Sequence, residues 1–120
     1  MPIHRLSQRA LLKILRGDVL EDATCVIKFY SSNCHLCHEL KETYEEIAND
    51  YEDLLFFAFN VKDDPRITKK LSFKGVPTIT LMKVIKGQKT DVKKIAEPKP
   101  PDKKTWYTAD HIKSFIEKEK

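Results

Sequence analysis

The fold is decided by one stretch of the sequence, Cys25 to Cys37, which reads CVIKFYSSNCHLC. Its first six residues form a short, largely apolar run that predicts a strand, and the next three are loop formers. From Cys34 to about residue 50, apolar residues recur at three- and four-residue steps, which predicts a helix. Two cysteines therefore lie at a helix N-terminus, where unpaired N–H groups and the helix dipole stabilise a thiolate. We expect Cys34 to be the exposed, attacking thiol and Cys37 the resolving thiol.

The patterns on either side of this stretch predict an α/β layer arrangement with a mixed sheet. Ser7 can cap a helix that runs to about Arg16 and stops at Gly17. The other expected elements are a buried strand over residues 54–61, a short helix opened by Asp63-Asp64-Pro65, strands over residues 78–85 and 92–96 joined by a turn at Lys86-Gly87-Gln88, and a last helix from about Thr108. We expect one domain over residues 1–120, with an extended basic Pro/Lys loop over residues 97–107.

The bulk composition excludes several classes of protein. With 120 residues, 41% of them hydrophobic and 33% charged, the chain is an ordinary globular one with room for one core. No apolar run is long enough to span a membrane, and no signal peptide is recognisable, so we expect a cytoplasmic protein. Residues 1–60 carry six Lys/Arg and ten Asp/Glu, whereas residues 61–120 carry sixteen and eight. The lysines are scattered, so we interpret the basic half as solvated surface and expect no nucleic-acid partner.

Three parts of the chain resemble the thioredoxin superfamily. Residues 29–37 resemble its active-site segment, residues 59–65 its next strand and helix start, and Gly75-Val76-Pro77-Thr78 its cis-proline loop. The resemblance implies a thioredoxin fold, with a central mixed sheet flanked by helices on both faces. It also implies a thiol–disulfide oxidoreductase that exchanges the Cys34–Cys37 pair with protein substrates through a mixed disulfide on Cys34.

The resemblance also implies the surroundings of the thiols. Pro77 would be cis, lie against the disulfide and keep metal off the thiols, while the Val76 backbone would pair with an extended substrate segment. We expect protein disulfides and a reductase or other electron donor as partners, no cofactor or metal, no membrane association, and a monomer.

The residues around the cysteines depart from the family pattern. Asn33 stands where thioredoxins usually carry Trp, and His35 and Leu36 stand in place of Gly-Pro. A His35 imidazole that is protonated or donates toward sulfur would favour the thiolate and make the disulfide more oxidising; alternatively it points to solvent. We expect His38 on the helix surface and Cys25 in the core.

Lys28 is the larger departure. It stands six residues before the first cysteine, where the family has a buried acid, and the lysine that commonly faces that acid is Ala58 here. A buried cation would favour the Cys37 thiolate, which leads to the hypothesis of a reduction potential above that of ordinary thioredoxin. Alternatively, Lys28 buries only its stem and turns its amine to water.

The segment from Glu97 to Tyr107 is longer than the family's usual connection to the last helix. Two interpretations remain open: a partner-recognition arm beside the active site, or a loop pinned by Trp106 in a hydrophobic slot. Ala96 stands where thioredoxins have a glycine that lines the substrate groove, so we expect it to narrow that groove.

Three alternatives compete with an oxidoreductase. Cys34-His35-Leu36-Cys37-His38 matches a covalent haem attachment pattern, but strands rather than helices surround it. A structural zinc site needs four ligands, and Cys25, His4 and His111 do not form a second cluster. The strongest alternative is a non-catalytic thioredoxin-like module that docks a partner through its basic C-terminal half.

Overall fold

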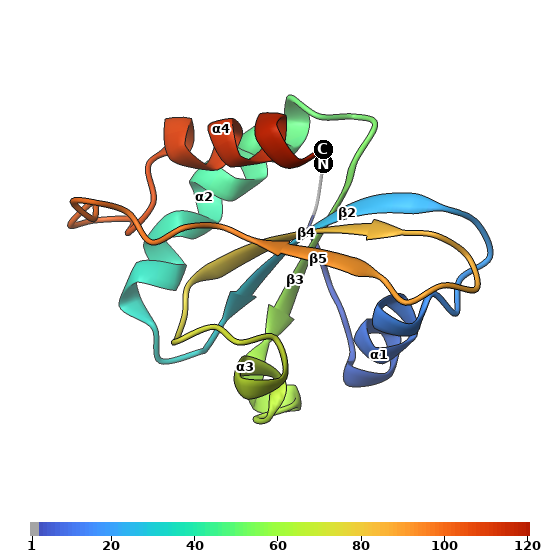
Figure 1. The fold of residues 1–120 in the computed structure, drawn as a ribbon. Coiled ribbons are helices and arrows are strands. Elements are labelled where there is room, and N and C mark those ends of the chain that lie inside the picture. Colours follow the sequence, from blue (N-terminus) through green and yellow to red (C-terminus); the bar gives the residue numbers. More distant parts are fainter. Residues whose placement is uncertain (1–2) are drawn as a thin grey trace.

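A five-stranded mixed sheet forms the centre of the computed structural model, which describes residues 3–120 (Figure 1). Its strands are β1 (His4–Arg5), β2 (Ala23–Tyr30), β3 (Leu55–Asn60), β4 (Thr78–Val84) and β5 (Asp91–Lys94). They lie in the order β1-β3-β2-β4-β5. The first three of these run parallel, β4 is antiparallel to β2, and β5 is antiparallel to β4. The expected mixed sheet is confirmed.

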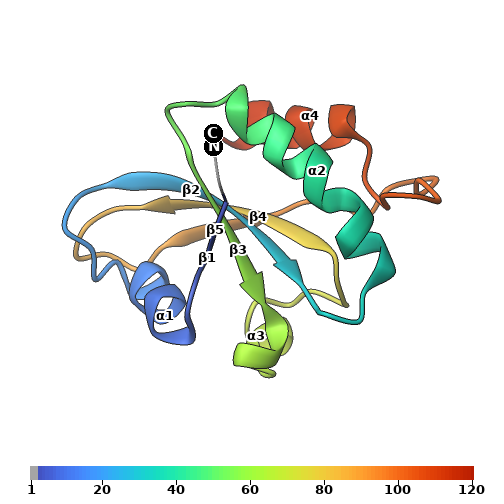
Figure 2. The same cartoon turned by 180° about the vertical axis from the view of Figure 1, so that it is seen from behind.

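Helices cover both faces of the sheet (Figure 2). The helices are α1 (Gln8–Arg16), α2 (His35–Asn49), α3 (Ile67–Lys70) and α4 (Ala109–Glu119), with a 3-10 turn η1 (Val61–Asp63). α2 and α4 lie on one face, and α1 and α3 lie on the other. Each pair encloses an apolar core with the sheet. The two cores explain why the strands near the middle of the sheet are apolar on both sides.

The β2 strand joins the two cores. Val26 packs into the core under α2 and α4, whereas Ile27 and Phe29 pack into the core over α1 and α3; all three are fully buried. Tyr44 of α2 is also fully buried, and its hydroxyl lies 3.0 Å from the carbonyl oxygen of Val26 and 2.7 Å from that of Phe57. This contact fixes α2 across β2 and β3, and so places the helix N-terminus directly beyond the end of β2.

The helix ends follow the sequence signals in three cases. Ser7 caps α1 by accepting a hydrogen bond from Ala10 N at 3.1 Å, and Gly17 ends that helix in the left-handed region with φ 73°. Thr108 caps α4 by accepting from His111 N at 3.1 Å. The segment between β5 and α4 is irregular apart from one bridge, as expected.

The short helix was placed too early by the sequence. Asp64 does not cap it: the Asp64 carboxylate accepts from Arg66 N at 3.2 Å in a turn, and α3 begins at Ile67. The reason is that Asn60 starts η1 first by accepting from Lys62 N at 3.0 Å, which places Asp64 at the end of that turn.

The two-residue strand β1 was missed altogether. It pairs with β3 through His4↔Phe57 and Arg5↔Ala58, and an Arg5–Asp63 ion pair at 2.8 Å supports it. Two residues are too few to show a period-two pattern, so no sequence signal marks this strand.

Gly17 provides a test of the packing between α1 and the β4–β5 turn. A Cβ on Gly17 would lie 2.0 Å from the Gln88 carbonyl oxygen, whereas one on Gly87, at a similar φ of 81°, would meet nothing within 4 Å. We expect Gly17→Ala to cost more than about 3 kcal/mol of unfolding free energy, and Gly87→Ala about 1–2 kcal/mol from backbone strain alone. Urea denaturation measures both, and equal losses would contradict the close approach.

Candidate active site

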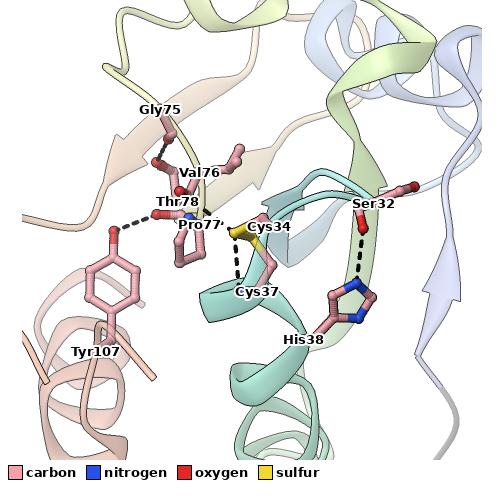
Figure 3. The surroundings of a disulfide bond; sticks show 9 residues. All are labelled: Ser32, Cys34, Cys37, His38, Gly75, Val76, Pro77, Thr78 and Tyr107. Atoms are coloured by element: carbon pink, nitrogen blue, oxygen red, sulfur yellow. Dashed lines mark hydrogen bonds between the residues drawn. A yellow bond between two sulfur atoms is a disulfide. The ribbon is translucent and has the colours of Figure 1, made fainter. Parts of the chain in front are cut away.

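Cys34 and Cys37 lie at the N-terminus of α2, directly beyond β2 (Figure 3). Cys34 is the N-cap residue, with extended backbone at φ −91° and ψ 106°. The two cysteines form a disulfide with their Cα atoms 5.2 Å apart. Cys34 is half-buried, whereas Cys37 is only 3% exposed. An external disulfide can therefore reach Cys34 more easily than Cys37.

The first turn of α2 directs a hydrogen-bond donor at Cys34. The N–H of Cys37 donates to Cys34 Sγ at 3.0 Å. At a helix N-terminus such an N–H has no partner within the helix, and it stabilises negative charge on the sulfur. Reduction of the disulfide thus leaves the Cys34 sulfur with a hydrogen-bond donor already directed at it, which favours its thiolate form.

The loop before β4 lies against the disulfide. Cys34 Sγ is 3.9 Å from the carbonyl oxygen of Val76, and the Val76–Pro77 peptide bond is cis. Thr78 Oγ1 donates to the Gly75 carbonyl oxygen at 2.6 Å and closes the turn. The N–H of Val76 makes no hydrogen bond to any other group of residues 3–120, so it is free to pair with an added strand. The structure brings Val76, Pro77 and exposed Ala96 together along one groove.

Lys28 is buried on the α2 side of the sheet. It is 5% exposed, and with Cys37, Tyr44 and Glu45 it lines a cavity of about 270 Å³. Its Nζ lies 5.0 Å from the ring centroid of Tyr44, a cation–π contact. Burial lowers the pKa of the Lys28 amine to about 8; Glu45 opposes this shift and Lys41 adds to it. The register places Ala58 directly beside Lys28 on β3.

The other residues singled out around the disulfide lie at the surface or near it. The His35 side chain is 82% exposed, and its imidazole lies 4.0 Å from the Glu39 carboxylate rather than against sulfur. Asn33 is exposed and Leu36 half-buried. Cys25 is a free cysteine in the core, where burial raises the pKa of its thiol to about 11. It is inert as a nucleophile at neutral pH.

Three contacts that sequence reasoning missed hold the site in place. The His38 Nε2 lies 3.0 Å from the Ser32 carbonyl oxygen, and Asn60 donates to Ser32 Oγ at 3.1 Å, so α2 and β3 both hold the loop before Cys34. On the far side of the cis-proline loop, the Tyr107 hydroxyl donates to the Pro77 carbonyl oxygen at 3.1 Å (Figure 3). These pairs join residues 6, 28 and 30 positions apart, and no local pattern could have indicated the two longer ones.

A dithiol at a helix N-terminus that faces a cis-proline loop, on a mixed sheet covered by helices, defines a protein of the thioredoxin class. The family model described as Thioredoxin matches residues 12–105. The chain belongs to the thioredoxin family, and it is a thiol–disulfide oxidoreductase.

Individual relatives agree with this assignment. A thioredoxin of Acidithiobacillus ferridurans is 34% identical over 77 residues, which cover 62% of this chain and 71% of that protein. The structure of mitochondrial thioredoxin 3 from Saccharomyces cerevisiae in its oxidized form matches with a TM-score of 0.68 at 20% identity, covering 97% of this chain and 94% of that one. Chloroplastic thioredoxin z matches with a TM-score of 0.67 at 17% identity, covering 98% and 94%. The thioredoxin fold expected from the sequence is confirmed.

Among residues 3–120, no three His, Cys, Asp or Glu side chains converge as a metal-ligand set. Within the same residues, no helix combines the length and the apolar character that a membrane crossing requires.

Lys28 makes stability depend on pH. Its folded-state pKa of about 8 lies below the ordinary 10.5. Below pH 8 the buried amine is charged and lowers the free energy of unfolding by the full cost of burying that charge. This loss shrinks as the pH rises toward 10.5, because the folded protein then holds a neutral amine. We expect oxidised Lys28→Met to be more stable than wild type by about 3 kcal/mol at pH 7, and by much less at pH 10.5. Urea denaturation at both pH values measures this, with Lys83→Met, at the one exposed position of β4, as control. An advantage that is the same at both pH values would contradict the buried charge.

Proposed function

We propose that Cys34 attacks protein disulfides and that Cys37 resolves the resulting mixed disulfide. The observation that carries this assignment is the Cys37 N–H at 3.0 Å from the sulfur of the more accessible cysteine. The Cys34 thiolate attacks one substrate sulfur, forms a bond to it and expels the other as a thiolate. The Cys37 thiolate then attacks Cys34 Sγ, which restores the intramolecular disulfide and releases the second substrate thiol. The protein loses two electrons and the substrate gains them.

Val76, Pro77 and Ala96 are proposed to bind the substrate segment. The free N–H of Val76 and its carbonyl oxygen beside Cys34 offer one donor and one acceptor to an extended chain. The Pro77 ring is buried against the same turn, and Ala96 borders the groove from the opposite side. A substrate strand laid on Val76 would bring its own sulfur to Cys34.

Lys28 is proposed to set the redox poise. A cation in the cavity that Cys37 also lines stabilises the Cys37 thiolate, which stabilises the reduced protein and raises the reduction potential. Asn33, His35 and Leu36 are proposed to modulate the poise more weakly. The exposed imidazole of His35, beside Glu39, supports only a small, salt-screened effect on sulfur.

The family implies protein substrates and a reductase as partners. We propose further that the chain acts as a monomer, as one domain over residues 1–120, in the cytoplasm.

Substitution of each cysteine tests their separate roles. We expect Cys34→Ser to abolish reduction of insulin disulfides, because no nucleophile remains at the helix N-terminus. Cys37→Ser should lose turnover and accumulate a mixed disulfide with the substrate, detectable by mass spectrometry. Cys25→Ser is the matched control and should keep turnover if folded. Normal reductase activity in Cys34→Ser would contradict the assignment of Cys34 as the nucleophile. Absence of reductase activity in the wild type, together with full partner binding by Cys34→Ser, would favour the non-catalytic module.

The reduction potential tests the role of Lys28. Equilibration with glutathione buffers at pH 7 should give a value above the roughly −270 mV of thioredoxin. Lys28→Met should lower the potential by about 30 mV, a tenfold change in the exchange equilibrium constant. Lys113→Met, which removes an exposed cation paired with Asp50 at the other end of α2, should leave it unchanged. A wild-type potential as reducing as that of thioredoxin would refute the hypothesis.

A further inference from the structure

A groove of about 350 Å³ lies beside the cis-proline loop, and the residues that line it come from that loop, from the end of β5 and from the segment before α4. Val76 and Pro77 form part of one wall, and Ala96, Trp106 and Tyr107 form part of another. Apart from Ala96, the second wall belongs to the segment over residues 97–107 that precedes α4. In Figure 1 this segment, the start of α2 and the loop before β4 all lie at the same end of the molecule. The groove is therefore continuous with the proposed substrate-pairing site.

Trp106 is held in this wall by a tight turn. Its φ of 67° is in the left-handed region, which a bulky side chain adopts only under constraint. Asp102 supplies that constraint: Asp102 and Trp106 exchange both backbone hydrogen bonds, at 2.9 and 3.0 Å. The Asp102 carboxylate also accepts from Lys104 N at 2.8 Å and Thr105 N at 2.9 Å, which lowers the pKa of Asp102. The turn fixes the direction in which the indole projects.

Tyr107 fixes this wall relative to the disulfide. Its hydroxyl donates to the carbonyl oxygen of Pro77, while Cys34 contacts the carbonyl oxygen of Val76 from the opposite side (Figure 3). The Tyr107 ring is 2% exposed and packs in the core under α2 and α4. Trp106 is only half-buried, packs against the same core and leaves the rest of its surface to the groove. The indole thus has a defined position relative to the reacting sulfur.

The charges around the groove favour an acidic occupant. Lys74 and Lys94 line it, opposed by Glu97, which lies 3.8 Å from Lys74. The segment before α4 adds three exposed lysines and one carboxylate; these lysines are Lys99, Lys103 and Lys104. Acidic residues on a substrate would complement this surplus of positive charge, and they would also accelerate the association of the substrate with the groove.

We propose that Trp106 is a specificity-determining residue: it forms an apolar subsite for substrate segments in which the reactive cysteine is flanked by an aromatic side chain and acidic residues. The proposal rests on the function proposed above, since the substrate segment must pair with Val76 for the substrate's aromatic side chain to reach the indole of Trp106. Asn33 leaves the other side of the site without an aromatic group in the position before Cys34. Of the three aromatic residues that line the groove, Phe73 and Tyr107 are buried, so the half-buried Trp106 offers the most accessible aromatic surface.

The test compares three short synthetic peptides, each a homodimer joined through one central cysteine. The first carries Phe two positions from the cysteine on either side and Glu at its ends; the second has Ser for Phe, and the third has Lys for Glu. Reduced protein is mixed with each, and chromatography measures the rate of peptide reduction. Each exchange oxidises Cys34 and Cys37 to their disulfide and yields two peptide thiols.

We expect the wild type to reduce the Phe peptide about tenfold faster than the Ser peptide. In Trp106→Ala the ratio should fall below about twofold. Because both rates come from the same preparation, the ratio does not change with the fraction of folded protein. Leu20→Ala, which removes a 93% exposed apolar side chain elsewhere, is the control and should keep the tenfold ratio.

A second variant, with Lys99, Lys103 and Lys104 all changed to Gln, tests the acidic preference at exposed positions. It should lose the severalfold preference for Glu over Lys peptides that the wild type shows at low salt. Equal wild-type rates for all peptides, or a tenfold ratio that survives in Trp106→Ala, would overturn the subsite. Failure of the wild type to reduce any peptide would instead refute the proposed function.

Discussion

The capping of α2 by Cys34 is the constraint on which the site depends. The disulfide joins residues three apart, a spacing that the first turn of a helix spans. That turn must begin directly after β2 for the sulfur to emerge at the C-terminal end of this strand. Tyr44, two turns further on, fixes the helix across β2 and β3 through the carbonyl oxygens of Val26 and Phe57. The same geometry directs the Cys37 N–H at Cys34, so the arrangement that forms the disulfide also prepares the thiolate. Structure and reactivity come from one local feature.

Much of this could be predicted from the sequence, because the relevant signals are local. Ser7, Gly17 and Thr108 are short-range capping signals, and the structure shows each of them in that role. The apolar run of β2 and the helical spacing after Cys34 are likewise local. The Gly75-Val76-Pro77-Thr78 motif identified the loop opposite the cysteines, and the structure has the cis peptide bond there. Roles of individual site residues stay predictions, since they concern reactions.

The parts that could not be predicted depend on contacts between distant residues. The strand β1 has two residues and is defined by its partner β3. The burial of Lys28 depends on how α2 lies over the sheet, and the sequence left open whether the amine is buried or turned to water. Tyr107 looked like the end of a loop, yet it holds the cis-proline loop from a position 30 residues later. The sequence left open whether residues 97–107 form a partner-recognition arm or a loop pinned by Trp106 in a slot. Trp106 does pack against the core, but the Asp102 turn also presents it to the groove.

Two of the departures of this chain from ordinary thioredoxin, Lys28 and Trp106, lie in separate regions of the site. Lys28 lines the cavity beneath α2 with Cys37, whereas Trp106 lines the groove beyond the cis-proline loop, and the two hollows share no lining residue. Substitutions at two sites that share no contacting residue tend to have additive effects on free energy. In the proposed mechanism, the electrostatic field at Cys37 sets how strongly the dithiol reduces, and the groove selects which disulfides reach Cys34. Under these proposals, reduction potential and substrate choice depend on different residues, and a change in one does not require a change in the other.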